Sequence, residues 1–243
     1  MTTARLDRLL ANLGYGSRRT VQQLAASGRV VLDGQPITDA SRRVPVGPDL
    51  PARMTVAGAP VDPPAPLTLM MHKPLGVVCS HKEEGARVYD LLPARWRARD
   101  PALSTIGRLD KETSGLLLIT DDGPLLHRVI SPKSHVPKRY LADLDRPLSG
   151  DEAAVFADGG LMLEGEDKPL APAVLESVSP TRAWLTIHEG RYHQVRRMFA
   201  AVGNHVTALH RDRIGGLALP DNLPPGQWRV LAAVEISNIF TGC

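Results

Sequence analysis

The sequence predicts an α+β protein with a small N-terminal module and a larger body that holds a mixed, mainly antiparallel sheet. In the body, short apolar segments alternate with helical ones, with neither a regular βαβ rhythm nor a glycine-rich phosphate loop. Seven of the 21 prolines fall within residues 45–66. Because proline fixes φ and lacks an amide donor, the densest part, 62–67, is expected to be a semi-rigid linker. The expected domains are therefore 1–61 and 62–243.

The N-terminal module is predicted to begin with two short helices. Leucine recurs at helical spacing through residues 6–13, and Gly14 ends the run. Ser17 suits the N-cap of a second helix that extends to Gly28. Residues 30–37 then predict a β-hairpin that turns at an Asp-Gly pair.

The body is predicted to contain six strands and four helices. The strands are expected at 67–71, 76–79, 115–120, 139–144, 183–188 and 205–209. The helices are expected at 88–92, 124–130, 151–157 and 191–202. Since the helices and strands follow no repeating order, a mixed or antiparallel sheet is favoured over a doubly wound one.

The apolar runs and the cysteine count bear on the cellular location of the protein. The longest apolar runs are much shorter than the ~20 residues that cross a bilayer, and the N-terminus lacks the apolar stretch of a secretion signal. The two cysteines, Cys79 and Cys243, are too few for a disulfide framework or a cysteine-based zinc site. We therefore expect a soluble, cytoplasmic protein without membrane contact.

The excess positive charge is concentrated at the N-terminus. Residues 1–50 contain seven arginines and four aspartates, whereas residues 51–243 contain 22 basic and 22 acidic side chains. Arginine presents a planar fork that matches phosphate. A solvated helix face is the plain alternative, but Asp7 is the one acid among residues 1–32. The charge distribution therefore predicts contact with RNA or DNA.

A second feature is the segment 106–119, in which a polar loop of both charge signs precedes a fully apolar strand. This arrangement places Asp110 near the rim of the core. Asp110 can turn the loop by bonding to its own backbone. It can instead be a catalytic carboxylate, kept ionised by Arg108 and Lys111. From the spacing alone, these two interpretations stand equal.

A third interpretation of the same segment is a calcium loop. Positions of an EF-hand-like loop are occupied by Asp110, Glu112, Ser114, Gly115 and Asp121. Such a loop lies between two helices, however, and Pro101 and Gly107 disfavour an entering helix. Calcium is therefore disfavoured.

The N-terminal residues 4–50 resemble the S4 RNA-binding domain. The matching residues are Arg5-Leu6-Asp7, Leu9, Gly14, Ser17-Arg18, Leu24, Gly28-Arg29-Val30 and Asp33-Gly34. The resemblance implies that the two helices dock on structured RNA through phosphate contacts. The candidate RNA-binding residues are Arg5, Arg8, Arg18, Arg19 and Arg29.

Stretches of the body resemble a single enzyme family. They are GRLDKETSGL at 107–116, KRYL at 138–141, EGRYHQVRRMFA at 189–200 and HVTALHRDRIG at 205–215. These resemble the pseudouridine synthases, specifically the ribosomal RNA branch with an N-terminal S4 domain. Further stretches look most like the small-subunit (RsuA-type) enzymes.

The resemblance implies isomerisation of uridine in RNA: the N-glycosidic bond breaks, the uracil rotates, and a bond forms between C5 and C1′. It implies no metal and no organic cofactor. Asp110 matches the family's catalytic aspartate, as nucleophile at C1′ or base at C2′. Tyr140 matches a tyrosine implied to stack on the base, and Arg196 a basic residue implied to pair with Asp110. The candidate substrate-binding residues are Arg108, Leu109, Leu209, Arg191, His193 and Gln194.

Helical spacing bears on Arg196 independently. The apolar stripe of the helix predicted at 191–202 consists of Val195, Met198, Phe199 and Val202. Arg196 lies about 100° from Val195, on the flank of this stripe. A guanidinium at the edge of a buried face needs an anionic partner, and Asp110 is a natural one. Arg197 falls on the far side and is expected in solvent or on phosphate.

The expected partner is ribosomal RNA, most simply small-subunit (16S) RNA within a partly assembled ribonucleoprotein, and the expected state is a monomer. An unstacked or incompletely assembled RNA lowers the cost of extruding a uridine. Two alternatives stay open: a large-subunit synthase of the same branch, and a non-catalytic RNA-binding assembly factor.

Overall fold

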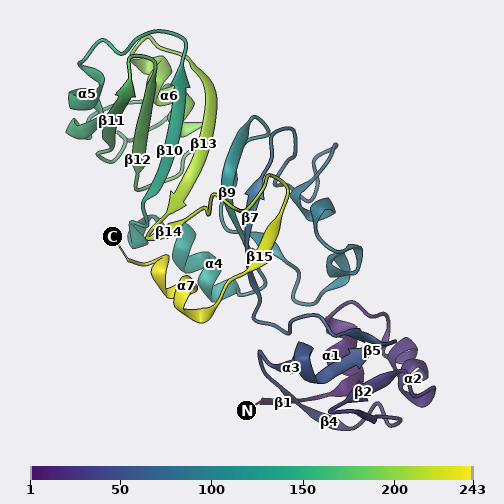
Figure 1. Ribbon diagram of the computed structural model, residues 1–243. Coiled ribbons are helices and arrows are strands. Elements are labelled where there is room, and N and C mark those ends of the chain that lie inside the picture. Colours follow the sequence, from purple (N-terminus) through teal and green to yellow (C-terminus); the bar gives the residue numbers. More distant parts are fainter. Residues whose placement is uncertain (1, 242–243) are drawn as a thin grey trace. The chain divides into compact units, whose positions relative to one another are not determined.

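The computed structural model describes residues 2–241 and forms two compact units, each with its own core (Figure 1). The first unit holds the chain up to Leu67 together with Leu92–Ser104 and Thr120–Asp122, and the second holds Thr68–Leu91, Thr105–Ile119 and the chain from Gly123 on. Two segments distant in sequence therefore pack with the N-terminal elements.

The first unit contains the two predicted helices, α1 (Leu6–Asn12) and α2 (Arg18–Ala26). The leucines of α1 are buried in the core of this unit. Ser17 caps α2 as predicted, because its hydroxyl accepts a hydrogen bond from the backbone N–H of Thr20 at 3.2 Å.

Two small sheets complete this unit. One pairs β1 (Thr2–Arg5) with β4 (Arg43–Val46), and the other has the order β3-β2-β5-β6. The latter consists of β2 (Val30–Leu32), β3 (Gln35–Pro36), β5 (Met54–Val56) and β6 (Ala59–Pro60). The predicted hairpin is β2 and β3, and both residues of its Asp33-Gly34 turn have positive φ.

The proline-rich stretch contains more secondary structure than its composition suggests. It holds the short helix α3 (Leu50–Arg53), and β5 is an inner strand between β2 and β6. The strand β5 contains no proline, and Pro60 lies on the edge strand β6, where a missing donor costs little. Residues 62–67, predicted as the linker, form neither helix nor strand, and they belong to the first compact unit. The inserted segment 92–104 adds a 3₁₀ helix, η2 (Ala94–Ala98).

The second unit is built on a nine-stranded sheet in which β11-β12-β10-β13-β9-β7-β15 is the path of neighbours. The strands on this path are β7 (Thr68–Lys73), β9 (Thr113–Thr120), β10 (Lys138–Leu144), β11 (Val174–Ser179), β12 (Arg182–Ile187), β13 (Val206–Ile214) and β15 (Trp228–Val230). The pair β13–β9 is parallel, and the pairs of β10, β12 and β11 are antiparallel. The prediction of a mixed, mainly antiparallel sheet is confirmed.

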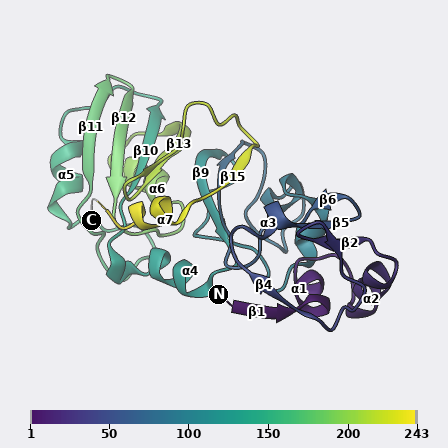
Figure 2. The ribbon, with the colours of Figure 1, turned by 60° about the horizontal axis from the view of Figure 1, so that its bottom comes forward.

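The short strands β8 (Ser104–Thr105) and β14 (Leu217–Ala218) pair with β9 and β13. Helices α5 (Glu152–Asp158) and α6 (Gln194–Ala201) contact each other through the rings of Phe156 and Phe199. In both views α5 lies beside the β11 edge (Figure 2). Helices α4 (Gly123–Ile130) and α7 (Ala233–Asn238) contribute apolar residues to the core around β9.

Three sequence-based assignments are corrected. Residues 76–79 form no strand; Val78 makes only an isolated bridge to Arg87, in a loop rich in exposed polar residues. The helix expected at 88–92 is a 3₁₀ helix, η1 (Val88–Leu91). The helix expected at 191–202 begins at Gln194, because His193 has a positive φ of 48°. No helix in the described part of the chain is long and apolar enough to span a membrane.

Candidate active site

Asp110 lies in the loop before β9, within the second unit, and its side chain is one-third exposed. Its backbone carbonyl accepts a hydrogen bond from Thr113 N at 3.1 Å and so closes a turn. Its carboxylate has a different partner: Oδ1 lies 3.3 Å from Nε2 of His193. The hydrogen bond that closes the turn uses the backbone carbonyl of Asp110, so the side-chain carboxylate is left to contact other groups.

A cavity of about 190 Å³ adjoins this carboxylate. Its lining residues come from the Asp110 loop and the start of β9, from α4 and the two residues after it, from β10 and β12, from the turn before α6 and the start of α6, and from β13. Those predicted from the sequence are Arg108, Leu109, Asp110, Tyr140, Arg191, His193, Gln194 and Leu209. The volume is below the roughly 300–1,000 Å³ of a drug-sized site, as a pocket for one small ring should be.

The register of the sheet explains why these residues meet. Strand β13 pairs with β10 on one side and with β9 on the other, so Arg211 lies opposite both Tyr140 and Gly115. Gly115 has φ +113°, and a Cβ atom there would lie 2.1 Å from the carbonyl oxygen of Arg211. Only glycine therefore allows β9 to approach β13 at this position.

Arg211 is a residue to which the sequence reasoning gave no role. Its side chain is buried, donates from Nε to Leu116 O at 2.9 Å, and donates from Nη1 to the hydroxyl of Tyr140 at 3.2 Å. Its Nη2 is buried with no hydrogen-bond partner among the described residues. The available signal was strand alternation: Leu209 and Arg211 point to one face of a strand, but the predicted strand stopped at 209.

Lys73, which is fully buried at the end of β7, binds the backbone of the Asp110 loop. Its Nζ donates to the carbonyl oxygens of Thr113 at 2.8 Å, Pro74 at 3.0 Å and Lys111 at 3.4 Å. Burial lowers the pKa of Lys73, while the charges of Cys79 and Asp110 act in the opposite direction. Two of its bonds reach Lys111 and Thr113, one and three residues after Asp110, so Lys73 fixes the shape of this loop.

Arg196 does not pair with Asp110, and that expectation is wrong for this structure. Its guanidinium donates to the carbonyl oxygens of Val206 and Glu112, both at 2.9 Å. Because α6 begins only at Gln194, the preceding turn brings His193 to the carboxylate, and Arg196 faces backbone carbonyls. These two carbonyl oxygens take two of the five guanidinium donors, so the backbone and not a carboxylate holds Arg196.

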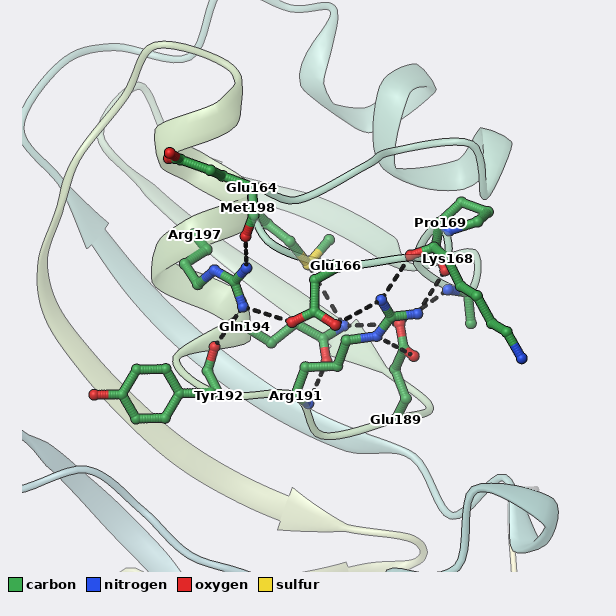
Figure 3. Close-up of polar contacts among 11 residues, drawn as sticks. Glu164, Glu166, Lys168, Pro169, Glu189, Arg191, Tyr192, Gln194, Arg197 and Met198 are labelled. Atoms are coloured by element: carbon green, nitrogen blue, oxygen red, sulfur yellow. Dashed lines mark hydrogen bonds and ion pairs between the residues drawn. The ribbon is translucent and has the colours of Figure 1, made fainter.

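Arg191 lines the cavity, but its donors are used within the chain (Figure 3). It binds the carboxylates of Glu189 and Glu166 at 3.1 and 3.2 Å and the carbonyls of Lys168 and Pro169. Arg197, expected in solvent or on phosphate, also binds Glu166, at 2.9 Å.

This network, defined by Glu166, Glu189, Arg191, Gln194 and Arg197, ties the turn before α6 to the segment around Glu166. The two arginines lower the pKa of Glu166, with the hydrogen bond from Arg197 the largest cause. Gln194 adds a bond within the turn, since its side-chain oxygen accepts from Arg191 N at 2.9 Å. The network thereby fixes the turn that carries His193.

The calcium interpretation is not supported by the contacts of its ligand set. The carboxylate of Asp121 accepts hydrogen bonds from Leu67 N and from Arg99, and the Ser114 hydroxyl bonds to Nδ1 of His210. Among residues 2–241, no three His, Cys, Asp or Glu side chains gather into a possible metal site.

The arginines predicted to bind RNA are all exposed in the first unit. Arg5 is engaged, because it forms an ion pair with the buried carboxylate of Asp7 at 2.9 Å and lowers the pKa of that group. The other four, Arg8, Arg18, Arg19 and Arg29, form no ion pair within the described chain. Unpaired exposed guanidinium groups are what phosphate contacts require.

A carboxylate beside a small pocket is an arrangement of enzyme sites, and the exposed arginines of the first unit suit an RNA substrate. Residues 68–201 match the family model described as RNA pseudouridylate synthase, and residues 4–49 match the S4 domain. The chain belongs to the RNA pseudouridylate synthase family and carries an N-terminal S4 domain.

Individual relatives are similar to this chain over nearly its full length. The chain is 41% identical over 240 residues to ribosomal small subunit pseudouridine synthase A of Escherichia coli (strain K12), covering 97% of this chain and 99% of the relative. The protein of that name from Pseudomonas aeruginosa is 41% identical, with 97% and 100% covered. A solved structure described as a pseudouridylate synthase is 35% identical, with a TM-score of 0.67, and covers 97% of this chain and 99% of that one.

Proposed function

We propose that this enzyme isomerises a specific uridine of small-subunit ribosomal RNA to pseudouridine. The support is the name of relatives that are 41% identical over 97% of the chain, together with the pocket beside Asp110. The reaction breaks the bond between N1 of uracil and C1′, turns the base, and joins C5 to C1′. The proton on C5 is lost, and N1 gains one, so the reaction is an isomerisation.

The observation that carries this proposal is the position of the Asp110 carboxylate on the wall of a small pocket that also contains Tyr140 and Leu209. As an anion it serves either as nucleophile at C1′ or as base at C2′. The imidazole of His193, with its Nε2 3.3 Å from Oδ1, lies beside the carboxylate and restricts its orientation. Arg196 is a positioning residue: it binds the carbonyl oxygen of Glu112 and so helps to hold the loop that carries Asp110.

Tyr140 and Leu209 are proposed to hold the extruded base. Both are nearly buried and line the pocket. The tyrosine ring supplies a face for stacking, and the leucine supplies an apolar wall. Because the Tyr140 oxygen accepts a hydrogen bond from Arg211, its own hydrogen is left for a second acceptor.

We assign RNA anchoring to the segment 1–61 and catalysis to the segment 62–243. The proposed substrate is a partly assembled small-subunit ribonucleoprotein in the cytoplasm, and the proposed working state is a monomer. An RNA that is not yet folded requires less energy to release one base, a saving of a few kcal/mol.

The test is a pseudouridine map of ribosomal RNA from cells with and without the gene. One small-subunit position should lose its pseudouridine in the deletion strain and regain it on complementation. A lost position in large-subunit RNA would identify the related large-subunit activity. An unchanged map of both RNAs would contradict the proposed function.

A further inference from the structure

A second cavity, of about 580 Å³, lies next to the Asp110 pocket in the same unit. The two cavities share Gly107–Asp110 and part of the turn before α6. Asp110 therefore stands between a small cavity on one side and a larger one on the other. The larger volume falls within the roughly 300–1,000 Å³ of sites that enclose a whole small ligand.

Tyr192 lines this second cavity, and its side chain is unusual in its exposure. It is 69% exposed in a chain with only 4% aromatic residues. One face of its ring stacks on His193, with the ring centroids 3.8 Å apart and the planes at 17°. Since His193 also contacts Asp110, the exposed ring is one residue removed from the proposed catalytic carboxylate.

The position of Tyr192 is fixed by its backbone. Its carbonyl oxygen accepts a hydrogen bond from Nη1 of Arg197 at 3.1 Å, and Arg197 is in turn bound to Glu166. Figure 3 shows the ring projecting away from this network. An aromatic ring that is held in place and left open on the other side is a stacking surface for a nucleic-acid base.

The charges of the cavity fit a nucleotide. Arg108 and Lys111 line it, and neither side chain makes a hydrogen bond or ion pair within the described residues. Arg191 also lines it but is bound to Glu166 and Glu189. Glu83 is the one acid in the lining besides Asp110. Two free cations beside an aromatic ring suit a phosphate that is attached to a base.

We infer that this second cavity binds the nucleotide adjacent to the target uridine, with its base stacked on Tyr192. The inference rests on the proposed function, because it requires that a uridine occupies the smaller pocket. A neighbouring nucleotide is covalently joined to that uridine and must therefore lie close to Asp110. Tyr192 is a binding residue and takes no part in bond making or breaking.

The experiment compares two RNA substrates that carry the mapped uridine, assembled with ribosomal proteins in the form that wild type modifies. One has natural sequence, and the other has abasic nucleotides on both sides of the uridine. On natural RNA, Y192A is expected to raise KM about 5- to 150-fold, the size of a single base–aromatic stack, with kcat unchanged. On the abasic RNA, Y192A and wild type should have equal KM.

The controls are Y192F, which keeps the ring and should restore the KM, and V234A. Val234 is an apolar residue of α7 with 68% exposure, close to that of Tyr192, and its removal should leave KM unchanged. Melting temperatures confirm that each variant folds. If wild type forms no pseudouridine on any small-subunit substrate, the proposed function fails. If wild type is active and Y192A has an unchanged KM, or an equally raised KM on both RNAs, only the stacking inference is overturned.

Discussion

Nε2 of His193 lies 3.3 Å from Oδ1 of Asp110. The two residues come from separate sequence motifs, and the contact depends on the positive φ of His193, which directs its ring from the start of α6 toward the Asp110 loop. The contact gives the carboxylate a defined orientation and leaves it beside the pocket.

Replacing His193 by alanine is expected to lower kcat about 10- to 100-fold, the cost of a misplaced reacting group. H193Q keeps a donor at a similar distance and should recover much of the loss. Single-turnover rates on small-subunit RNA measure the effect. Equal rates for H193A and wild type would show that the contact has no role in the reaction.

Arg211 is expected to act through the hydroxyl of Tyr140. R211M and Y140F should each slow the reaction, and the double variant should be no slower than the slower of the two. A double-mutant cycle on kcat checks this. Fully additive losses would mean that Arg211 acts on something other than the Tyr140 hydroxyl.

Gly115→Ala should destabilise the second unit because its Cβ would overlap the backbone of Arg211. The matched control is Gly85→Ala, where φ is also positive, at +105°, and the space is open. G115A should lose about 1–3 kcal/mol more free energy of unfolding than G85A, the cost of overpacking. Urea denaturation measures both, and equal losses would contradict the close approach of β9 and β13.

The pairing of Glu166 with Arg197 and Arg191 predicts a pH-dependent contribution to stability. The pKa of Glu166 is lowered from its usual 4.5, so the stabilisation is present above that pH and is lost as pH falls through the folded-state pKa. E166Q should therefore be less stable than wild type at pH 7, and the difference should shrink below about pH 4.5. E164Q removes a nearby exposed acid whose side chain lies outside the network and should show no such difference.

Arg18 and Arg19 are expected to bind RNA phosphates. Replacing both by alanine should weaken RNA binding and reduce the salt slope by about 0.7–0.9 for each phosphate that is no longer neutralised. Arg53 is a matched control in the same unit, because its guanidinium is already paired with Asp33 and Asp49. Salt slopes of R18A/R19A and R53A that equal that of wild type would refute the assignment.

Local sequence patterns predicted the helices and strands that bury a regular apolar face. The leucine stripe of α1, the Ser17 cap of α2 and the apolar run of β9 are of this kind. Patterns did not predict β15 or the packing of 92–104 with the first unit, because short segments are stabilised by contacts distant in sequence.

The residues of the candidate site were likewise predicted only in part. The motifs predicted that Asp110, Tyr140, His193 and Leu209 would line one pocket, and they do. They did not predict that His193 would replace Arg196 at the carboxylate, because a single residue with positive φ shifts the start of α6. Arg211 was overlooked because the predicted strand ended at 209, whereas β13 continues to Ile214 and is held there by its cross-strand partners.

The role of Asp110 is tested most directly by the conversion of the mapped small-subunit uridine by purified wild type, D110N and E112Q. D110N keeps the shape of the side chain and removes its charge, whereas E112Q makes the same change at an exposed acid two residues away. Wild type and E112Q should form pseudouridine at comparable rates, and D110N should be slower by a factor of about 10² to 10⁴ or more. Pseudouridine formation by D110N at the wild-type rate would contradict the assignment of Asp110 as the catalytic carboxylate.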